Sequence, residues 1–174
     1  MMSGDTVTPS RQQYLDIRAQ HPDAIVFFRL GDFYETFDDD AATVARELDL
    51  VLTSRPQGKN ARVPMAGVPH HAAENYIARL IAKGYKVALC EQIGTDVING
   101  LMPREVVRVF TAGTVIEPGM LEAGRNNYLA AVVLDDGRAG LAYADITTGE
   151  FATTQLVSHR DLVEELARLA PAEL

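Results

Sequence analysis

The sequence is poor in the features that mark secreted and membrane-spanning proteins. It holds one cysteine, Cys90, so no disulfide can form within the chain, as is usual for proteins of a reducing cytoplasm. It has no apolar run of the about 18 residues that a membrane span needs. The first residues, Met1 to Asp5, have neither the basic nor the apolar region of a signal peptide. We therefore expect a cytoplasmic protein with no membrane contact.

Basic side chains are also scarce. The chain has 16 Lys and Arg against 24 Asp and Glu, which gives a formal net charge of −8. Phosphate contacts supply most of the affinity of DNA-binding proteins, so this balance disfavours tight DNA binding by the chain alone. The charge is uneven, because residues 50–113 are net positive and the segments on either side are both acidic. Only the middle of the chain can face phosphates, and a larger protein would have to supply the remaining contacts.

A phosphate-binding loop is absent as well, because no G-x-x-x-x-G-K-[ST] occurs in the chain. What is present is typical of a globular protein, with 47% apolar and 23% charged residues. A length of 174 residues is enough for one domain and part of another.

The most informative local pattern lies at residues 24–37. An apolar run and an aromatic run are joined by Gly31-Asp32, and two β-prone runs joined by such a pair predict a hairpin. On the second strand, alternation places one set of side chains on one face and another set on the opposite face: Phe33, Glu35 and Phe37 against Tyr34 and Thr36. Phe33 follows the turn directly and should lie at the tip, roughly 7 Å along the strand from Glu35.

A flat apolar ring beside a carboxylate at an exposed tip suits recognition of a planar partner with hydrogen-bonding edges, such as a nucleobase. The alternative is that the aromatic hairpin is simply part of the core, which is the commoner role of such a pattern. A third interpretation is a protein-interaction module in which the hairpin docks a partner protein.

The remaining pattern predicts an α/β fold, a mixed β-sheet flanked by helices, over about residues 8–113. Thr8-Pro9 is a helix-start signal. The helices expected are 8–20, 41–48 and 72–83, and the further strands are 50–53, 86–93 and 104–111. Residues 55–62 read as a polar loop and 63–69 as an extended segment. After a linker at 114–126, we expect a three-stranded meander at 128–134, 139–147 and 151–156 and a helix at 161–169.

Several groups have the residue types of other sites. Asp38 to Asp40, or Asp145, could hold a divalent metal in a nuclease, although the three aspartates are better explained as one helix cap and two favourable charges at a helix N-terminus. His70-His71 with Glu74 lacks the spacing of a zinc site. A modest basic patch is expected at Arg55, Lys59 and Arg62.

The segment 28–35, Phe-Arg-Leu-Gly-Asp-Phe-Tyr-Glu, resembles the mismatch-reading segment of the bacterial MutS mismatch-repair family, whose Phe-x-Glu motif is met by Phe33-Tyr34-Glu35. The resemblance continues in order through four further stretches: 52–55, 63–72, 90–94 and 108–114. It implies a mismatch-recognition domain at residues 1–113, a linker at 114–126 and, at 127–174, the start of a connector domain with ribonuclease-H-like topology. It also implies that the chain continues beyond Leu174.

The resemblance further implies roles for single residues. Phe33 would stack on a mispaired or bulged base and Glu35 would hydrogen-bond that base. Arg55 and Arg104 match family positions near the DNA and would contact its backbone or line its groove, and Met65 lies in the extended segment expected alongside the DNA. The partners implied are double-stranded DNA with mismatches or small loops, a second copy of the full-length protein and downstream mismatch-repair factors. ATP and Mg are expected in a domain of the parent protein outside these residues, so this segment should hold no cofactor and be no enzyme.

Overall fold

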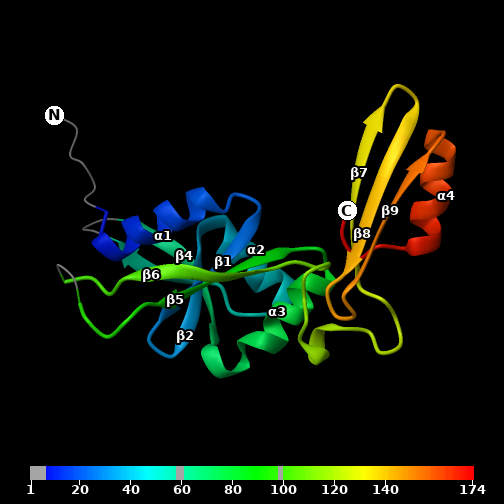
Figure 1. The fold of residues 1–174 in the computed structure, drawn as a ribbon. Coiled ribbons are helices and arrows are strands. Elements are labelled where there is room, and N and C mark those ends of the chain that lie inside the picture. The colour runs from blue at the N-terminus through cyan, green and yellow to red at the C-terminus, as the bar shows by residue number, and fades with distance from the viewer. Residues whose placement is uncertain (1–6, 58–60, 98–99) are drawn as a thin grey trace. The chain divides into compact units, whose positions relative to one another are not determined.

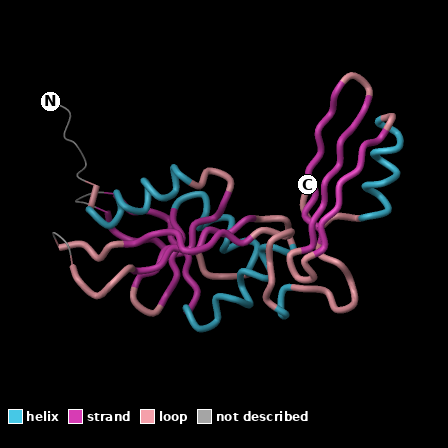
Figure 2. Tube along the Cα trace, in the orientation of Figure 1, coloured by secondary structure: helices cyan, strands magenta, loops and turns pink. Residues whose placement is uncertain are grey.

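The computed structural model describes residues 7–57, 61–97 and 100–174. Its contacts divide the chain into two compact units, Met1–Phe110 and Thr111–Leu174. Figure 1 labels the helices and strands, and Figure 2 shows the Cα trace in the same orientation, coloured by secondary structure. Among the described residues, no helix has both the length and the apolar character needed to cross a membrane.

The first unit is a six-stranded mixed sheet with helices on both faces. Its strands follow the order β3-β4-β2-β1-β5-β6, in which only β1 and β5 are parallel neighbours. The elements are α1 (Pro9–Gln20), β1 (Ala24–Leu30), β2 (Phe33–Phe37), α2 (Asp38–Leu48), β3 (Thr53–Gln57), β4 (Ala61–Pro69), α3 (Ala73–Ala82), β5 (Lys86–Gln92) and β6 (Arg104–Phe110), with a short 3-10 turn at His70–Ala72. The predicted mixed sheet flanked by helices is confirmed.

The two sheet faces follow from alternation along the strands. One face packs against α1 through a core whose members are Tyr14, Ile17, Ala24, Val26, Phe28, Phe37, Ala88 and Cys90. Helix α3 lies on the other side of the sheet, and α2 contacts it there (Figure 1). Residues of the opposite parity in β1 and β2, such as Phe27 and Tyr34, are buried on that side. Because both faces are covered, β1 is buried along most of its length.

Helix α1 begins as predicted, with Thr8 as N-cap accepting a hydrogen bond from the amide of Arg11, and Pro9 in the first turn. The predicted aspartate cap of α2 is wrong. The residue before α2 is Phe37, the last residue of β2, and no side chain caps the helix. Because β2 runs directly into α2, the aspartates fall inside the first turn, where Asp38 and Asp40 bind groups of α1 and β1 instead.

A second difference concerns residues 50–62. The short strand expected at 50–53 and the polar loop expected at 55–62 are wrong where the structure describes them, because Thr53–Gln57 and Ala61–Pro69 are the paired antiparallel strands β3 and β4. Residues 58–60 of the expected loop lie outside the described residues. Pro56 obscured the pattern, since proline cannot donate a hydrogen bond within a sheet. It is tolerated because β3 is an edge strand of the sheet.

The second unit holds the predicted three-stranded meander: β7 (Tyr128–Asp135), β8 (Arg138–Asp145) and β9 (Glu150–Leu156). Helix α4 (His159–Leu169) packs on it through Leu162 and Leu169. The segment before β7 contains a 3-10 turn at Pro118–Met120 and is held in this unit by a hydrogen bond and by burial of a side chain. The carboxylate of Glu173 accepts a hydrogen bond from the amide of Gly113 at 3.0 Å, and Val115 is buried.

Candidate functional site

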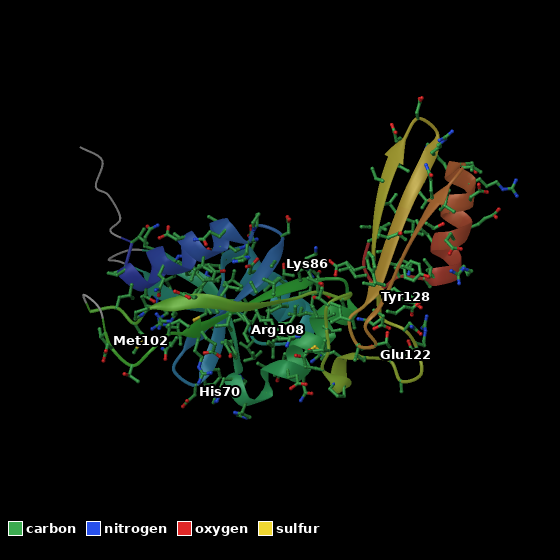
Figure 3. All side chains as sticks on the ribbon, in the orientation of Figure 1. His70, Lys86, Met102, Arg108, Glu122 and Tyr128 are labelled. Atoms are coloured by element: carbon green, nitrogen blue, oxygen red, sulfur yellow. The ribbon has the colours of Figure 1, made fainter. Side chains whose placement is uncertain are left out.

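Phe33 lies at the tip of the β1–β2 hairpin with 45% of its surface exposed. The tight turn before it is possible because Gly31 adopts a left-handed backbone conformation, with φ of 59°. The backbone of Phe33 pairs with Leu30 on one side and Pro69 on the other. The amide of His70, labelled in Figure 3, donates a hydrogen bond to the carbonyl oxygen of Asp32 at 2.9 Å. An exposed aromatic ring is therefore held on a backbone that neighbouring strands fix on both sides.

Glu35 lies two residues further along the same face of β2. Its Oε2 accepts a hydrogen bond from Nη1 of Arg55 at 3.1 Å, and the side chain of Glu35 is 16% exposed against 49% for Arg55. Burial raises the pKa of the Glu35 carboxyl, and the positive charge of Arg55 opposes that rise only in part. The carboxylate is thus partly withdrawn from water and held by one arginine.

Gly67 faces Glu35 across the β2–β4 ladder. A Cβ atom built at Gly67 would lie 3.5 Å from Cγ of Glu35 and 3.7 Å from Cδ1 of Phe33. These are ordinary van der Waals distances, so the side chains of Glu35 and Phe33 border the space that a side chain at position 67 would fill. The sequence signal for Gly67 was its place in the extended segment 63–69 and in the family-like stretch 63–72.

The opposite face of β2 is structural. Tyr34 is buried and its hydroxyl donates a hydrogen bond to Oε1 of Glu91 on β5. The guanidinium of Arg29 lies 5.4 Å from the Tyr34 ring centre, and its Nη1 lies 3.6 Å from the same Glu91 oxygen. Burial, together with the nearby Glu91 carboxylate, raises the pKa of Tyr34 to about 12. The predicted division of β2 into two faces is confirmed, because Phe37 packs in the α1-side core whereas Tyr34 lies beside Phe27 on the other side of the sheet.

Arg104 and Met65 point into the first unit. Nε of Arg104 donates to the carbonyl oxygen of Arg29 at 2.7 Å, and its Nη1 donates to Oε1 of Gln13 at 2.9 Å and to the carbonyl oxygen of Met102 at 3.1 Å. Its guanidinium also lies 4.8 Å from the ring centre of Phe28, and burial lowers its pKa. Met65 is partly buried and packs against the α1-side core. Both side chains therefore pack within the first unit, Met65 on the α1-side core and Arg104 against β1 and α1.

The basic patch of the β3–β4 hairpin is divided between the two faces of the sheet. Arg62 donates from Nε to Oγ of Ser54 at 2.8 Å and from Nη2 to the Ser54 carbonyl oxygen at 2.9 Å. Arg55, one position along from Arg62's strand partner Pro56, lies on the face of Glu35. Lys59, the third expected member, lies outside the described residues.

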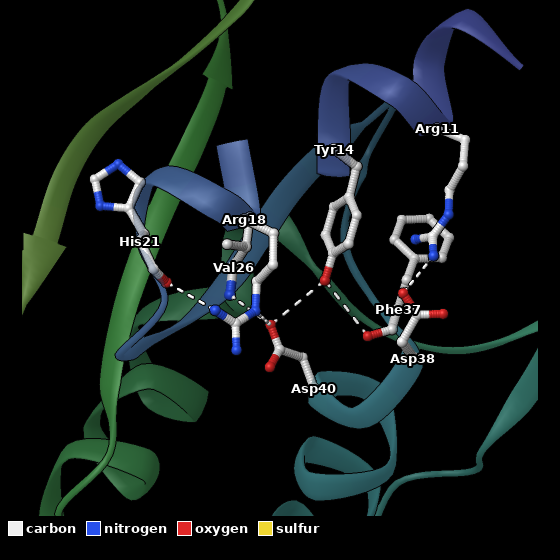
Figure 4. A network of polar contacts seen from close by, with 8 residues as sticks. All are labelled: Arg11, Tyr14, Arg18, His21, Val26, Phe37, Asp38 and Asp40. Carbon is white, nitrogen blue, oxygen red and sulfur yellow. Dashed lines mark hydrogen bonds and ion pairs between the residues drawn. The ribbon is translucent and has the colours of Figure 1, made fainter. Parts of the chain in front are cut away.

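The aspartates of the nuclease interpretation are bound by other protein groups (Figure 4). Asp38 pairs with Arg11, and Asp40 accepts hydrogen bonds from the amide of Val26 at 3.2 Å and from Tyr14, while its carboxylate lies 3.0 Å from Nε of Arg18. Asp40 therefore satisfies the amide of Val26, the third residue of β1, from the first turn of α2.

Asp145 is buried in the second unit and has a comparable local role. It accepts hydrogen bonds from the amide and the hydroxyl of Thr147 and from the amide of Asn127, and these hydrogen bonds lower its pKa, those from Thr147 most. Over the described ranges, no three His, Cys, Asp or Glu side chains gather in the way a metal ion requires. His70 and His71 have rings 5.9 Å apart beside the hairpin turn.

Comparison with known proteins adds two family matches. Residues 8–118 match the model described as MutS domain I, and residues 127–174 match MutS domain II. Proteins named DNA mismatch repair protein MutS are similar over almost the whole chain. That of Dehalococcoides mccartyi (strain CBDB1) is 53% identical over 171 residues, which cover 98% of this chain and 20% of the relative.

Two further relatives give the same result. The protein of Thermosynechococcus vestitus is 54% identical, with 97% of this chain and 20% of the relative covered. That of Symbiobacterium thermophilum is 56% identical, with 96% and 20% covered. The chain therefore spans about a fifth of the length of these relatives.

Proposed function

This chain belongs to the MutS family of DNA mismatch repair proteins, and from that membership we propose that its first unit recognises mispaired bases, bulges and small loops in double-stranded DNA. The observation that carries the proposal is the pairing of the exposed Phe33 ring with the half-withdrawn Glu35 carboxylate on one face of an anchored hairpin tip. An exposed ring adds little to folding, so its position is better explained by contact with a partner.

Phe33 would act by testing how easily the duplex deforms. The minor groove presents a degenerate set of donors and acceptors, so a protein that must detect any mispair cannot rely on base sequence there. A mispaired site has already lost stacking and pairing energy and therefore kinks at lower cost than paired DNA. Apolar side chains inserted at such steps stack on the unstacked base and hold the kink.

Glu35 would then form a hydrogen bond with the base on which Phe33 is stacked. A carboxylate beside the ring can accept a hydrogen bond from that base, or donate one when protonated, and burial already favours the protonated form more than in water. On paired DNA the same negative charge lies near phosphates with no base to bind, which is unfavourable. The two effects together would favour mispaired over paired DNA.

The remaining contributions would come from the full-length protein. We propose that it binds DNA as a homodimer and passes the signal to downstream mismatch-repair factors. ATP and Mg would bind elsewhere in it, since the residues of this chain include no phosphate-binding loop. The segment itself would be no enzyme. With a net charge of −8 it should bind DNA weakly when isolated, and a nanomolar, mismatch-selective complex of the isolated chain at physiological salt would contradict this.

The test is the equilibrium affinity of the full-length gene product for matched and mismatched duplexes at one salt concentration. Phe33→Ala should lower mismatch affinity about 5- to 150-fold, because base–aromatic stacking is worth about 1–3 kcal/mol. Phe151→Ala is the matched control, since Phe151 is also an exposed phenylalanine but lies on β9 of the second unit. It should bind as the unaltered protein does. Unchanged mismatch affinity of Phe33→Ala would refute the proposed insertion of Phe33 at the mispaired base.

The same experiment separates the two other classes of function. A protein-docking role for the hairpin would leave DNA affinity unchanged in Phe33→Ala while abolishing capture of a protein partner. Metal-dependent cleavage of the duplex by the purified chain would support the nuclease interpretation. The structure does not favour the nuclease interpretation, because Asp38, Asp40 and Asp145 are each bound by neighbouring groups of the fold.

A further inference from the structure

We propose that Arg55 is a positioning residue that neutralises Glu35 while no DNA is bound and transfers from Glu35 to a backbone phosphate only when a mispaired base is available to Glu35. The inference rests on the proposed function and assigns to one ion pair the discrimination between mispaired and paired DNA.

The geometry begins with the two strands that carry the pair. Glu35 lies on β2 and Arg55 on β3, and β4 runs between them. The long guanidinium side chain reaches across β4 on the face that also carries Phe33. Gly67, which faces Glu35 on β4, has no side chain to obstruct the carboxylate. The two side chains meet in one hydrogen-bonded ion pair, in which Nη1 of Arg55 lies 3.1 Å from Oε2 of Glu35.

The pair is unequal in its exposure to solvent. Glu35 is largely buried, so its charge needs a partner, whereas about half of the Arg55 side chain remains in contact with water. Because half of the Arg55 side chain already lies in water, its guanidinium can turn toward a phosphate with little desolvation of its own, and the cost of the move falls on Glu35, which loses its partner. A phosphate is a strong competitor for that arginine, because the planar guanidinium can donate two parallel charge-assisted hydrogen bonds to phosphate oxygens.

Over the described residues, Arg55 is the charged side chain that acts on the Glu35 carboxyl. Arg11 of α1, which lies near Arg55, is paired with Asp38 of α2. Arg11 and Arg55 line one cavity of about 340 Å³, together with Thr8, Ser10, Leu30, Phe37 and Pro56. Arg55 thus has a concave polar edge on one side and the Glu35 carboxylate on the other.

When Arg55 moves to a phosphate, Glu35 loses the partner of its charge. The buried carboxylate is left without its positive partner, which is unfavourable unless a new hydrogen bond forms. A base stacked on Phe33 supplies that bond, whereas paired DNA supplies none. The contact between Arg55 and a phosphate therefore becomes conditional on a mispair, although Arg55 itself reads no base.

The experiment measures how affinity depends on salt in the full-length gene product. Each phosphate contact contributes about 0.9 to the slope of log affinity against log salt concentration on duplex DNA. Arg55→Gln should lower the slope for a mismatched duplex by about 0.9 and lower the slope for the matched duplex by clearly less. In a Glu35→Gln background, where Arg55 has no carboxylate to return to, Arg55→Gln should lower both slopes equally.

Arg79→Gln is the matched control. Arg79 is 47% exposed and pairs with a carboxylate, Asp49, but it lies on α3 at the other face of the sheet. It should change neither slope. Arg55→Lys keeps the charge and should keep the slope of the unaltered protein, which guards against an effect of altered folding. Melting temperatures of all variants accompany the titrations.

Two results would overturn the proposal. An unchanged slope on mismatched DNA means that Arg55 stays with Glu35 in the complex. An equal loss on matched and mismatched DNA, with Glu35 present, means that Arg55 binds phosphate regardless of a mispair. Both differ from a failure of the proposed function, in which the unaltered protein shows no mismatch preference or Phe33→Ala leaves that preference intact.

Discussion

The amide of His70 donates a 2.9 Å hydrogen bond to the carbonyl oxygen of Asp32, so the residue after β4 closes the turn that carries Phe33. Nδ1 of His70 lies 3.2 Å from the same oxygen. The two residues are far apart in sequence, and the contact holds the hairpin tip in place without any partner. Preorganisation of this kind lowers the entropy that a binding residue loses when it contacts its target.

His70→Pro should weaken mismatch binding by loosening the tip. Proline removes the amide donor, and its backbone angle suits the first residue of a 3-10 turn. Pro69 already has the extended conformation that a following proline requires, with φ of −59° and ψ of 136°. The expected loss is about 0.5–1.5 kcal/mol, or roughly 2- to 12-fold in affinity. His70→Ala keeps the amide and isolates the contribution of the ring, so equal affinities for both variants would show that the backbone bond is irrelevant.

Tyr34→Ala should chiefly destabilise the fold. Truncation of a buried aromatic ring costs on the order of 3–5 kcal/mol, and Tyr34 also loses its hydrogen bond to Glu91. Tyr34→Phe keeps the ring and should cost about 1 kcal/mol. Urea unfolding of the chain measures both, with Phe33→Ala as the exposed counterpart that should lose far less. If Tyr34→Ala instead kept its stability and lost only DNA binding, the assignment of the two faces would be wrong.

Glu35→Ala should lower the ratio of mismatched to matched DNA affinity, because it should weaken the first and strengthen the second. Mismatch affinity should fall roughly tenfold with the loss of a hydrogen bond to the base. Matched affinity should rise, because the repulsion of phosphates disappears and Arg55 is released. Glu35→Gln should recover more mismatch affinity than alanine does, since the amide still forms hydrogen bonds. Equal losses on matched and mismatched duplexes would reduce Glu35 to a structural support.

Cys90 should resist thiol reagents while the first unit is folded. It is fully buried on β5, and burial raises the pKa of its thiol to about 12, with Arg104 opposing the shift and Glu91 and Glu105 adding to it. At pH 8 almost no reactive thiolate is then present. Labelling should be negligible in native buffer and complete in urea, and because Cys90 is the only cysteine a single signal reports unfolding. Rapid stoichiometric labelling of the native chain would contradict the buried position.

Much of the fold could be predicted from local patterns. The helix that begins at Thr8-Pro9, the hairpin around Gly31-Asp32 and the meander turn at Asp136-Gly137 are set by residues adjacent in sequence. Such signals act over a few residues, through capping, backbone angles and alternation, so they are visible before any tertiary contact forms. The β3–β4 hairpin escaped prediction because Pro56 is unusual in a strand and only its edge position permits it.

The sequence by itself determined that Phe33 and Glu35 share one face of β2 at an exposed tip, because alternation along a strand is a local property. Only the tertiary structure decided what surrounds them. Arg55 reaches Glu35 across β4, His70 closes the turn before Phe33, and Arg104 turns inward rather than outward. The physical reason is that a long side chain or a free amide binds whichever acceptor the fold brings within reach. Those acceptors come from strands distant in sequence, so no local pattern specifies them.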